Sequence, residues 1–311
     1  MTIQIGLALS GGGARGITHI GVLKVLEEAE IPISMLAGTS MGGIVAALYA
    51  TGRSASEIEQ HFRSLRILDV VQRDRSGMGL FGRDKIANLL QSVLGGDLTF
   101  EQLNLPLAFI ATDLETGEEV VIRDGSVIEG LLATISLPGI FAPARWRGRW
   151  LVDGALSNPV PFDVVRQMGA DRVIAANTKS VRGDLQSPKS TPRKRKGEPG
   201  LRLLLARSRW TPMLNVVERS IGIMGRRLVE QRMRETPPDL MIEVLLERVG
   251  NFDFGKMDMC IINGEQTARQ LLPELIELRD APLPGGWWRT LRQQFSSRNP
   301  SERSRQTRAA R

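Results

Sequence analysis

The chain has 311 residues, of which 42% are hydrophobic and 24% charged, a composition typical of a folded globular protein rather than a disordered chain or a coiled coil. One cysteine and two histidines exclude an intrachain disulfide framework and leave too few soft ligands for a structural zinc site. No apolar run reaches the ~20 residues needed to cross a bilayer, and residues 1–9 lack the features of a signal peptide. We therefore expect a cytoplasmic protein with one large domain over residues 1–285.

The net charge of +7 is concentrated in two segments. Residues 182–209 carry nine Lys or Arg against two acids, and residues 287–311 carry seven Arg against Glu302 alone, so the remainder is mildly acidic. Their composition predicts a mobile basic loop at 182–200 and a disordered tail at 286–311. A solvated charge run is the simplest interpretation of each. The alternative that we favour is contact with an anionic inner membrane surface, and we expect no nucleic-acid partner.

Strand-like and helix-like segments alternate along the chain. An apolar run at 3–9 precedes GGGARG and a helix that ends near Glu30, and a short strand at 33–37 precedes GTSMG and a helix at 44–49. The pattern continues with helices at 53–75 and 84–93, a hairpin of strands 107–111 and 119–122, a helix at 127–135, a strand at 146–152, a helix at 162–168, a strand at 172–176, a helix at 213–233, a strand at 240–245 and a last helix at 264–278. This alternation predicts the α/β class, with a mostly parallel central sheet, helices on both faces and functional groups at the carboxyl ends of the strands.

The sequence GTSMG, from Gly38 to Gly42, fits the GxSxG nucleophile elbow. In such an elbow the serine, here Ser40, lies on a strained turn between a strand and a helix, and the flanking glycines let the two elements approach. A short apolar strand precedes the motif and helix-forming residues follow it, as this geometry requires. The alternative is a glycine-rich helix start in which Ser40 is only the N-cap.

A nucleophilic serine needs a base, and the usual α/β-hydrolase order of serine, acid and histidine is not possible here. The only histidines are His19 and His61, and both lie in helical segments, where a solvated or hydrogen-bonded histidine is the default. The base is therefore sought among carboxylates. Asp153 is the best candidate because it ends a predicted strand and precedes a glycine, although an Asp-Gly pair is also a common turn former.

The loop GGGARG, at 11–16, links a strand to a helix, so its N–H groups can bind an anion. It matches the dinucleotide-binding pattern GxGxxG, but such a site needs an acid at the end of the second strand, where this chain has Ala-Gly-Thr at 37–39. The alternative is an oxyanion loop facing the serine, because the first two strands are expected to be neighbours. Arg15 would either orient this loop or form a surface salt bridge.

Together, GGGARG, GTSMG and the triplet DGA at 153–155, in this order and at these separations, closely resemble the patatin-like phospholipase family, in its bacterial and neuropathy-target-esterase branch. The resemblance extends over residues 3–278 and includes ATDLETGE at 111–118 and SLPGIFAP at 136–143. It implies a three-layer α/β/α hydrolase with no metal and no organic cofactor. Carried over by position, it implies that Ser40 is the nucleophile and Asp153 the base of a Ser–Asp dyad, with an oxyanion and substrate-binding region formed by Gly11, Gly12, Gly13, Arg15 and Met41.

These residues suit the hydrolysis of an ester through an acyl-enzyme. A carboxylate with an ordinary pKa of about 3.9 is a weak base for a serine hydroxyl, and without a histidine acid the dyad suits esters better than amides. The resemblance implies phospholipids or lysophospholipids as substrates. Three other classes stay open: an acyltransferase, a nucleotide-binding protein that uses GGGARG, and a catalytically inert lipid-binding adaptor on the same fold.

Overall fold

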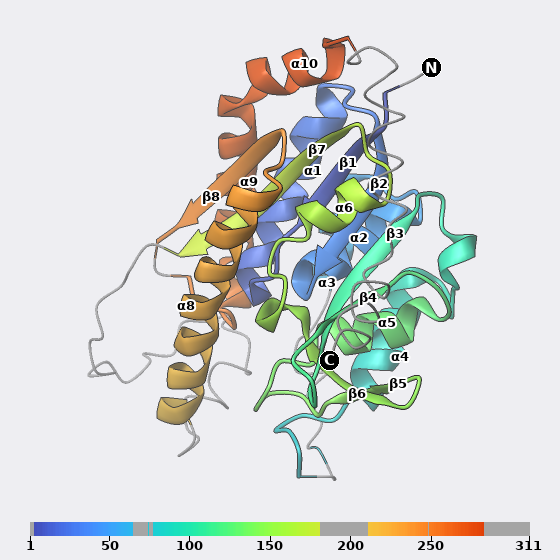
Figure 1. Ribbon diagram of the computed structural model, residues 1–311, viewed down its shortest axis with the longest axis vertical. Coiled ribbons are helices and arrows are strands. Elements are labelled where there is room, and N and C mark those ends of the chain that lie inside the picture. The colour runs from blue at the N-terminus through green and yellow to red at the C-terminus, as the bar shows by residue number, and fades with distance from the viewer. Residues whose placement is uncertain (1–2, 65–73, 75–76, 181–210, 248, 283–311) are drawn as a thin grey trace, which may run out of the picture.

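The computed structural model describes residues 3–64, 74, 77–180, 211–247 and 249–282, and it has a central sheet between two layers of helices (Figure 1). The strand order is β5-β6-β3-β2-β1-β7-β8, with β4 also paired to β3. Among the described residues, the parallel strands are β3 (Leu107–Asp113), β2 (Ile33–Thr39), β1 (Ile5–Leu9), β7 (Arg172–Ser180) and β8 (Leu240–Leu246). The antiparallel strands beside β3 are β4 (Glu119–Ile122), β6 (Arg149–Asp153) and β5 (Ala144–Trp146).

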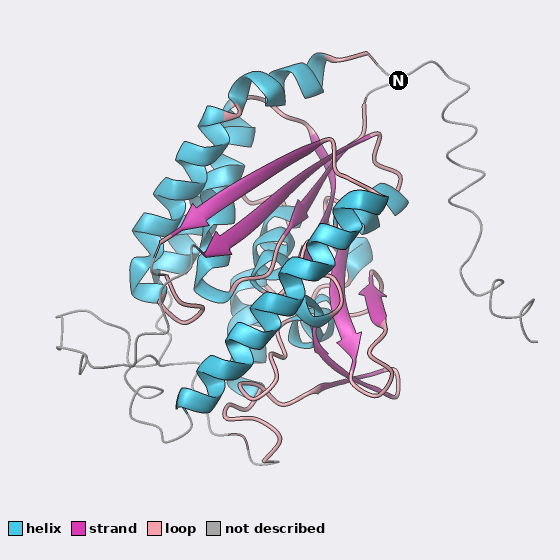
Figure 2. Ribbon diagram, turned by 60° about the vertical axis from the view of Figure 1, so that its left-hand side comes forward, coloured by secondary structure: helices cyan, strands magenta, loops and turns pink. Residues whose placement is uncertain are grey.

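Helices cover both faces of this sheet. The larger hydrophobic core lies between one face and a layer that contains α1 (Thr18–Glu28), α2 (Met41–Ala50), α3 (Ala55–Ser64), α4 (Asp84–Leu94), α5 (Val127–Thr134) and α9 (Met257–Gln270), with α10 (Leu272–Asp280) after α9. The other layer contains α6 (Phe162–Gln167) and α8 (Thr211–Glu235), the long helix that crosses in front of the strands in Figure 2. The short 3-10 helices of the described residues are η1 (Gly13–Ile17), η3 (Phe100–Gln102), η4 (Gly154–Leu156) and η5 (Phe254–Lys256).

The two faces of the sheet differ because side chains of different size alternate along the strands. On one face, leucines of β1 contact the larger core. On the other face, Ala8 of β1 pairs with Ala37 of β2 and with Ala175 of β7, and all three are fully buried. Ala108 of β3 pairs with Ala37 and extends this row. The small side chains leave room for Phe162 of α6, so the second layer packs directly onto the strands.

The α/β fold predicted from the sequence is confirmed. The parallel pairing of β1 with β2 brings the two glycine-containing turns to the same sheet edge, and β3 and β4 form the predicted hairpin. Strands that are buried on both faces explain why the sequence shows continuous apolar runs rather than alternation at β1 and β3. Within the described residues, no helix combines the length and the hydropathy needed to span a bilayer.

Two predicted elements are wrong in extent. The single strand predicted at 146–152 is a hairpin of β5 and β6, because Arg147 and Gly148 both have positive φ, at 48° and 81°, and form a tight turn. The last helix, predicted at 264–278, begins at Met257 and is divided into α9 and α10 before Pro273, which has no N–H to continue a helix. The predicted helix at 53–75 is described only as α3. The basic loop at 182–200 and the tail at 286–311 lie outside the described residues.

Candidate active site

Ser40 lies at the turn between β2 and α2, with φ 53° and ψ −122°. This backbone conformation is strained for a residue with a side chain and is typical of a nucleophile elbow. The close approach of strand and helix requires glycines, since a Cβ on Gly38 would lie 2.6 Å from the Gly42 backbone, and a Cβ on Gly42 would lie 2.4 Å from the Leu9 carbonyl oxygen. Ser40 occupies the N-cap position of α2, but its side chain makes no capping hydrogen bond to the helix.

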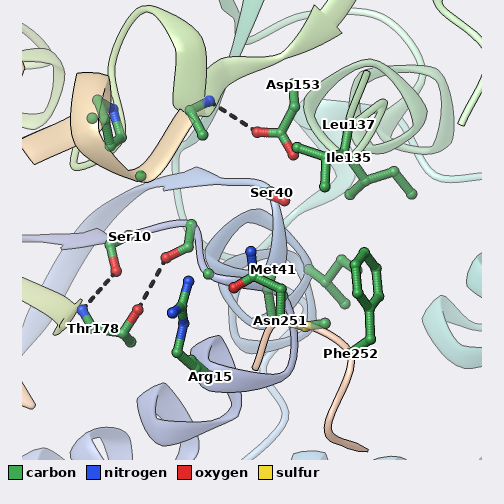
Figure 3. A pocket seen from close by; sticks show the side chains of 18 of the residues that line it. Ser10, Arg15, Ser40, Met41, Ile135, Leu137, Asp153, Thr178, Asn251 and Phe252 are labelled. Atoms are coloured by element: carbon green, nitrogen blue, oxygen red, sulfur yellow. Dashed lines mark hydrogen bonds between the residues drawn. The ribbon is translucent and has the colours of Figure 1, made fainter. Parts of the chain in front are cut away.

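Asp153 ends β6, where it pairs with Ala111 of β3, and it is only 1% exposed. Its N–H donates to the Ser136 carbonyl at 3.0 Å, and its Oδ1 accepts a hydrogen bond from the Ala155 N–H at 2.9 Å. In Figure 3 the Ser40 hydroxyl lies below the Asp153 carboxylate and points toward it. The fold thus brings together two residues that are distant in the sequence and were predicted to act together.

The environment of Asp153 changes its basicity. Burial raises the pKa of Asp153 to about 6, and the Ser40 hydroxyl and the Ala155 N–H, as hydrogen-bond donors, lower it by less than burial raises it. The carboxyl group is therefore ionised only above about pH 6, and once ionised it is a stronger base than an exposed aspartate. The raised pKa makes Asp153 better suited than an ordinary aspartate to accept a proton from a serine hydroxyl in the absence of a histidine.

The glycine loop packs directly against the elbow. A Cβ on Gly11 would lie 3.4 Å from the Ser40 Cβ, and a Cβ on Gly16 would lie 2.7 Å from the Cβ of Met41, the first residue of α2. The Ala14 N–H donates to the Asn251 carbonyl at 2.7 Å, so the loop after β8 holds the glycine loop in place. The loop and the elbow therefore share one site, as the sequence predicts.

The structure narrows the set of N–H groups that could bind an oxyanion. The Gly11 N–H already donates to the Pro159 carbonyl at 3.1 Å, so Gly11 is not available as a donor. The N–H groups of Gly12 and Gly13 have no acceptor among the described residues. The N–H of Met41 is likewise free of the helix ladder because it belongs to the first turn of α2. The arrangement therefore offers Gly12, Gly13 and Met41 for this task.

Arg15, on η1, is mostly buried behind the glycine loop, so it does not form the surface salt bridge that was one interpretation of the sequence. Burial lowers the pKa of its guanidinium, and the charge of Glu218 on α8 acts in the opposite direction. The pKa of Glu218 is itself raised by burial, and the Asn251 N–H donates to its carboxylate. The Nε of Arg15 has no hydrogen-bond partner among the described residues. Arg15 and Glu218 thus carry opposite charges that influence each other in the cavity wall.

Neither histidine occupies the position of a base. His19, on α1, is fully buried and its Nε2 is 2.8 Å from the Ser10 carbonyl oxygen, to which it donates. Burial lowers the pKa of His19 to about 4, so the ring is neutral at pH 7. His61, on α3, accepts a hydrogen bond from Arg53 at 3.3 Å. Both are hydrogen-bonded structural histidines, which is the default role expected from the sequence.

A cavity of about 1290 Å³ includes Ser40 and Asp153 in its wall. Its polar part is formed by the glycine loop, Arg15 and Glu218, and α8 forms a further side. Its apolar part is formed by side chains of α2, α3, α4 and α5: Leu48, Phe62, Ile86, Leu90, Leu94 and Leu131. The shape and lining fit a ligand with one long apolar part and one polar part. Within the described ranges, no three or more His, Cys, Asp or Glu side chains gather in a way that could hold a metal ion.

The family model for patatin-like phospholipases matches residues 7–166 of the chain. The chain belongs to the patatin-like phospholipase family. Among curated relatives, an uncharacterized NTE family protein of Mycobacterium tuberculosis is 35% identical over 177 residues, which are 56% of this chain and 49% of that protein. Patatin-like phospholipase domain-containing protein 6 of Homo sapiens is 37% identical over 187 residues, which are 57% of this chain and 13% of that protein. The chain thus spans about half or less of the length of these relatives.

The similarity to solved structures concerns the fold. VipD from Legionella pneumophila matches with a TM-score of 0.59 over 88% of this chain and 67% of that chain, at 14% sequence identity. The family match ends at residue 166, whereas Glu218 and Asn251 lie beyond it and still belong to the cavity wall.

Thr134 is a residue near the patatin-like elbow that the sequence analysis did not single out. It is fully buried at the end of α5, and its hydroxyl oxygen accepts a hydrogen bond from the Ser40 N–H at 2.9 Å. The only signal in the sequence is that Thr134 lies just before the SLPGIFAP segment. Thr134 therefore satisfies the N–H of the strained residue and stabilises the turn.

A second group that was missed ties α8 to the rest of the patatin-like domain. Arg232 of α8 donates to the carboxylates of Glu119 on β4 and Asp163 on α6. Asn158, five residues after Asp153, donates to the same two carboxylates, at 3.2 and 2.8 Å. We call these four residues the Arg232 cluster: Arg232, Glu119, Asp163 and Asn158. It fastens α8 beside the segment that follows Asp153.

Proposed function

We propose that the protein is a serine esterase that hydrolyses carboxylic ester bonds of phospholipids or lysophospholipids. The observation that carries this proposal is the Ser40 hydroxyl on a strained elbow, facing the buried carboxyl group of Asp153. The size and apolar lining of the cavity and the membership of the patatin-like phospholipase family support a lipid as the substrate.

In the proposed reaction, the Ser40 Oγ attacks the ester carbonyl carbon while Asp153 accepts the hydroxyl proton. The N–H groups of Gly12, Gly13 and Met41 stabilise the negative charge on the carbonyl oxygen, and one such donor is worth about 10² to 10³ in rate. The C–O bond then breaks, and Asp153 returns the proton to the departing alcohol. Water attacks the resulting acyl-enzyme, with Asp153 as base, and releases the carboxylic acid.

The apolar part of the cavity is the proposed place for the acyl chain. Leu48, Leu90 and Leu131 line it and offer no polar partner, whereas Arg15 and Glu218 lie at the polar part. An alcohol in place of water as the acyl acceptor would make the protein an acyltransferase. Analysis of the products from a labelled phospholipid separates the two: free fatty acid supports hydrolysis, and a transferred acyl chain contradicts it.

The experiment that tests the dyad is labelling by a fluorophosphonate, with the adduct mapped by mass spectrometry. We expect an adduct on Ser40 in the wild type, no adduct in Ser40→Ala, and labelling slowed by about 10³-fold or more in Asp153→Asn, because a catalytic base contributes on this scale. Circular dichroism of each variant controls for folding. A folded wild type that takes no label, or an adduct on another residue, would contradict the proposal.

The pH dependence of labelling gives a second test. Because the raised pKa of Asp153 is about 6, the labelling rate should rise as the pH is raised through 6 and then level off. An exposed aspartate would instead give an inflection near pH 4. Either that lower inflection or a rate independent of pH between 5 and 8 would show that Asp153 does not act as the base.

The protein is also proposed to make peripheral contact with an anionic membrane surface through the basic loop and the tail, which are known here from sequence alone. Deletion of 287–311 should weaken binding to anionic vesicles and leave turnover of a water-soluble ester unchanged. Equal vesicle binding before and after deletion would contradict this part of the proposal.

A further inference from the structure

Helix α8 has an exposed apolar flank that no contact among the described residues covers. Val216 is 63% exposed, Ile223 55% and Met224 49%. Val216 and Ile223 are seven residues apart, so they lie on the same side of the helix, and Met224 is next to Ile223. The other exposed large apolar side chains of the described residues are spread over loops, β4, β8, α9 and α10. Three within nine residues of one helix therefore form a local concentration.

Arginines outnumber carboxylates around this flank. Arg219, Arg226 and Arg227 are exposed on the same stretch of α8. The one carboxylate between 216 and 227 is Glu218, which is largely buried and faces the charge of Arg15 at the cavity. Beyond this stretch, Glu230 forms an ion pair with Arg227 at 3.7 Å, so three exposed arginines face one exposed carboxylate. The surface over residues 216–227 therefore combines apolar side chains with an excess of positive charge, the combination that favours the surface of an anionic bilayer.

The opposite side of the same helix forms part of the cavity wall. Ile221, Gly225 and Val229 line the cavity, and so does Arg226. Val216, Ile223 and Met224 do not. The Arg232 cluster fixes the C-terminal part of α8 to β4 and α6, so the helix is held in one orientation. A membrane that bound the outer side would therefore lie next to the cavity, and Figure 2 shows α8 at the front of the molecule, with the strands behind it.

We propose that the α8 flank, defined as Val216, Arg219, Ile223, Met224 and Arg227, docks the protein on an anionic phospholipid bilayer. Docking on a membrane is useful to the protein only if its substrate is a lipid, so this inference rests on the proposed function. Binding to the bilayer does not itself require catalysis. It is distinct from the contact proposed for the basic loop and the tail, because it places the cavity at the membrane instead of only tethering the chain. The apolar side chains enter the interface and the arginines contact the headgroups.

The test compares two pairs of exposed apolar residues in the full-length chain, in a Ser40→Ala background that prevents turnover. Ile223→Gln with Met224→Gln removes the apolar part of the α8 flank. Met259→Gln with Ile262→Gln is the matched control on α9, where the two side chains are 38% and 51% exposed but belong to the opposite helical layer. Sedimentation with vesicles of phosphatidylglycerol and phosphatidylcholine measures binding.

We expect the α8 pair to weaken vesicle binding by about tenfold or more, and the α9 pair to bind like the parent chain. Arg219→Gln with Arg227→Gln should weaken binding at low salt by about 25-fold, since each arginine near such a surface is worth about fivefold, and the difference should shrink at high salt. In a Ser40-containing chain, all of these variants should hydrolyse a water-soluble ester at the parental rate.

Three results would overturn the docking proposal. The first is vesicle binding by the α8 pair that equals that of the parent chain. The second is an equal loss in the α8 and α9 pairs. The third is a change in self-association of the α8 pair, measured by analytical ultracentrifugation, with no change in vesicle binding, because the flank would then be an interface between copies. Fluorophosphonate labelling of Ser40 is independent of all three, so failure of docking and failure of the esterase proposal can be told apart.

Discussion

The region that carries Ser40 and Asp153 and the region that encloses them are built in different ways. Ser40, Asp153 and the glycine loop each lie on a turn at the end of a strand, where the backbone conformation depends on nearby glycines. The later region, with α8 and the loop after β8, acts through side chains such as Arg232, whose partner Glu119 is 113 residues away in the chain. A strained turn requires glycines at fixed positions, which can be recognised in the sequence, whereas an ion pair between distant residues leaves no such pattern.

The largest effect is expected where backbone packing forms the elbow. In Gly42→Ala the new Cβ would lie 2.4 Å and 2.5 Å from the carbonyl oxygens of Leu9 and Ser10, which are held in the sheet edge. We expect the free energy of unfolding to fall by about 3 kcal/mol or more and labelling of Ser40 to be lost. Chemical denaturation and fluorophosphonate labelling measure the two effects.

Gly222→Ala on α8 is the matched control. A Cβ at Gly222 would meet no atom within 4 Å, and alanine favours a helix over glycine, so this variant should gain about 0.5 to 1 kcal/mol. If Gly42→Ala were as stable and as reactive as Gly222→Ala, the packing of the elbow against β1 would not be what positions Ser40.

The same contrast explains which parts could be predicted from the sequence. The elbow, the glycine loop and the aspartate that ends β6 were predictable because each has a motif of fixed spacing. The hairpin of β5 and β6 was not, because its turn depends on Arg147 in a conformation with positive φ, which a sequence pattern does not favour. Glu218 and Asn251 were not predictable, because their roles arise only when α8 and the loop after β8 fold back onto the glycine loop.

Asp153→Asn is expected to lower the activity of the protein and, at neutral or higher pH, to raise its stability. The pKa of Asp153 is raised from 3.8 to about 6 on folding, so the folded chain binds this proton more tightly than the unfolded chain does. The resulting stabilisation is fully present below about pH 4 and is lost as the pH rises through 6. Wild type should therefore lose about 2 to 3 kcal/mol between these limits through this group, and the variant should not.

Denaturation curves of the two chains at pH 4 and pH 8 check this difference. The inactive Asp153→Asn chain should be the more stable one at pH 8 and should approach the wild type at pH 4. A variant that is less stable at pH 8 would mean that the buried carboxylate is stabilised by its neighbours more than burial destabilises it.

Arg232→Met tests the enclosing region. It leaves the carboxylates of Glu119 and Asp163 close together without their cation, and the pKa of Glu119, already raised by burial, should rise further. Breaking a well-buried ion pair costs more, but these side chains keep some exposure to solvent, so we expect a loss of about 2 kcal/mol. Arg227→Met, at an 83% exposed side chain of the same helix, should change stability by less than about 0.5 kcal/mol. Equal effects of the two substitutions on thermal unfolding would contradict a fastening role for the Arg232 cluster.

Apart from the control substitutions, Thr134→Val is expected to have the smallest effect on stability, about 1 to 2 kcal/mol, because it leaves the Ser40 N–H without its acceptor in a buried position. Thr134 is not part of the cavity wall, so kcat should fall, by about tenfold, while KM stays unchanged. Thr134→Ser keeps the hydroxyl and should retain most of the activity. A rise in KM, or equal losses in the two variants, would point to a packing role for the side chain instead. Thr134 lies within residues 7–166, which the family model matches, yet no sequence motif marks it. A functional residue can therefore be predicted from the sequence where the backbone is locally strained, whichever region of the chain it belongs to.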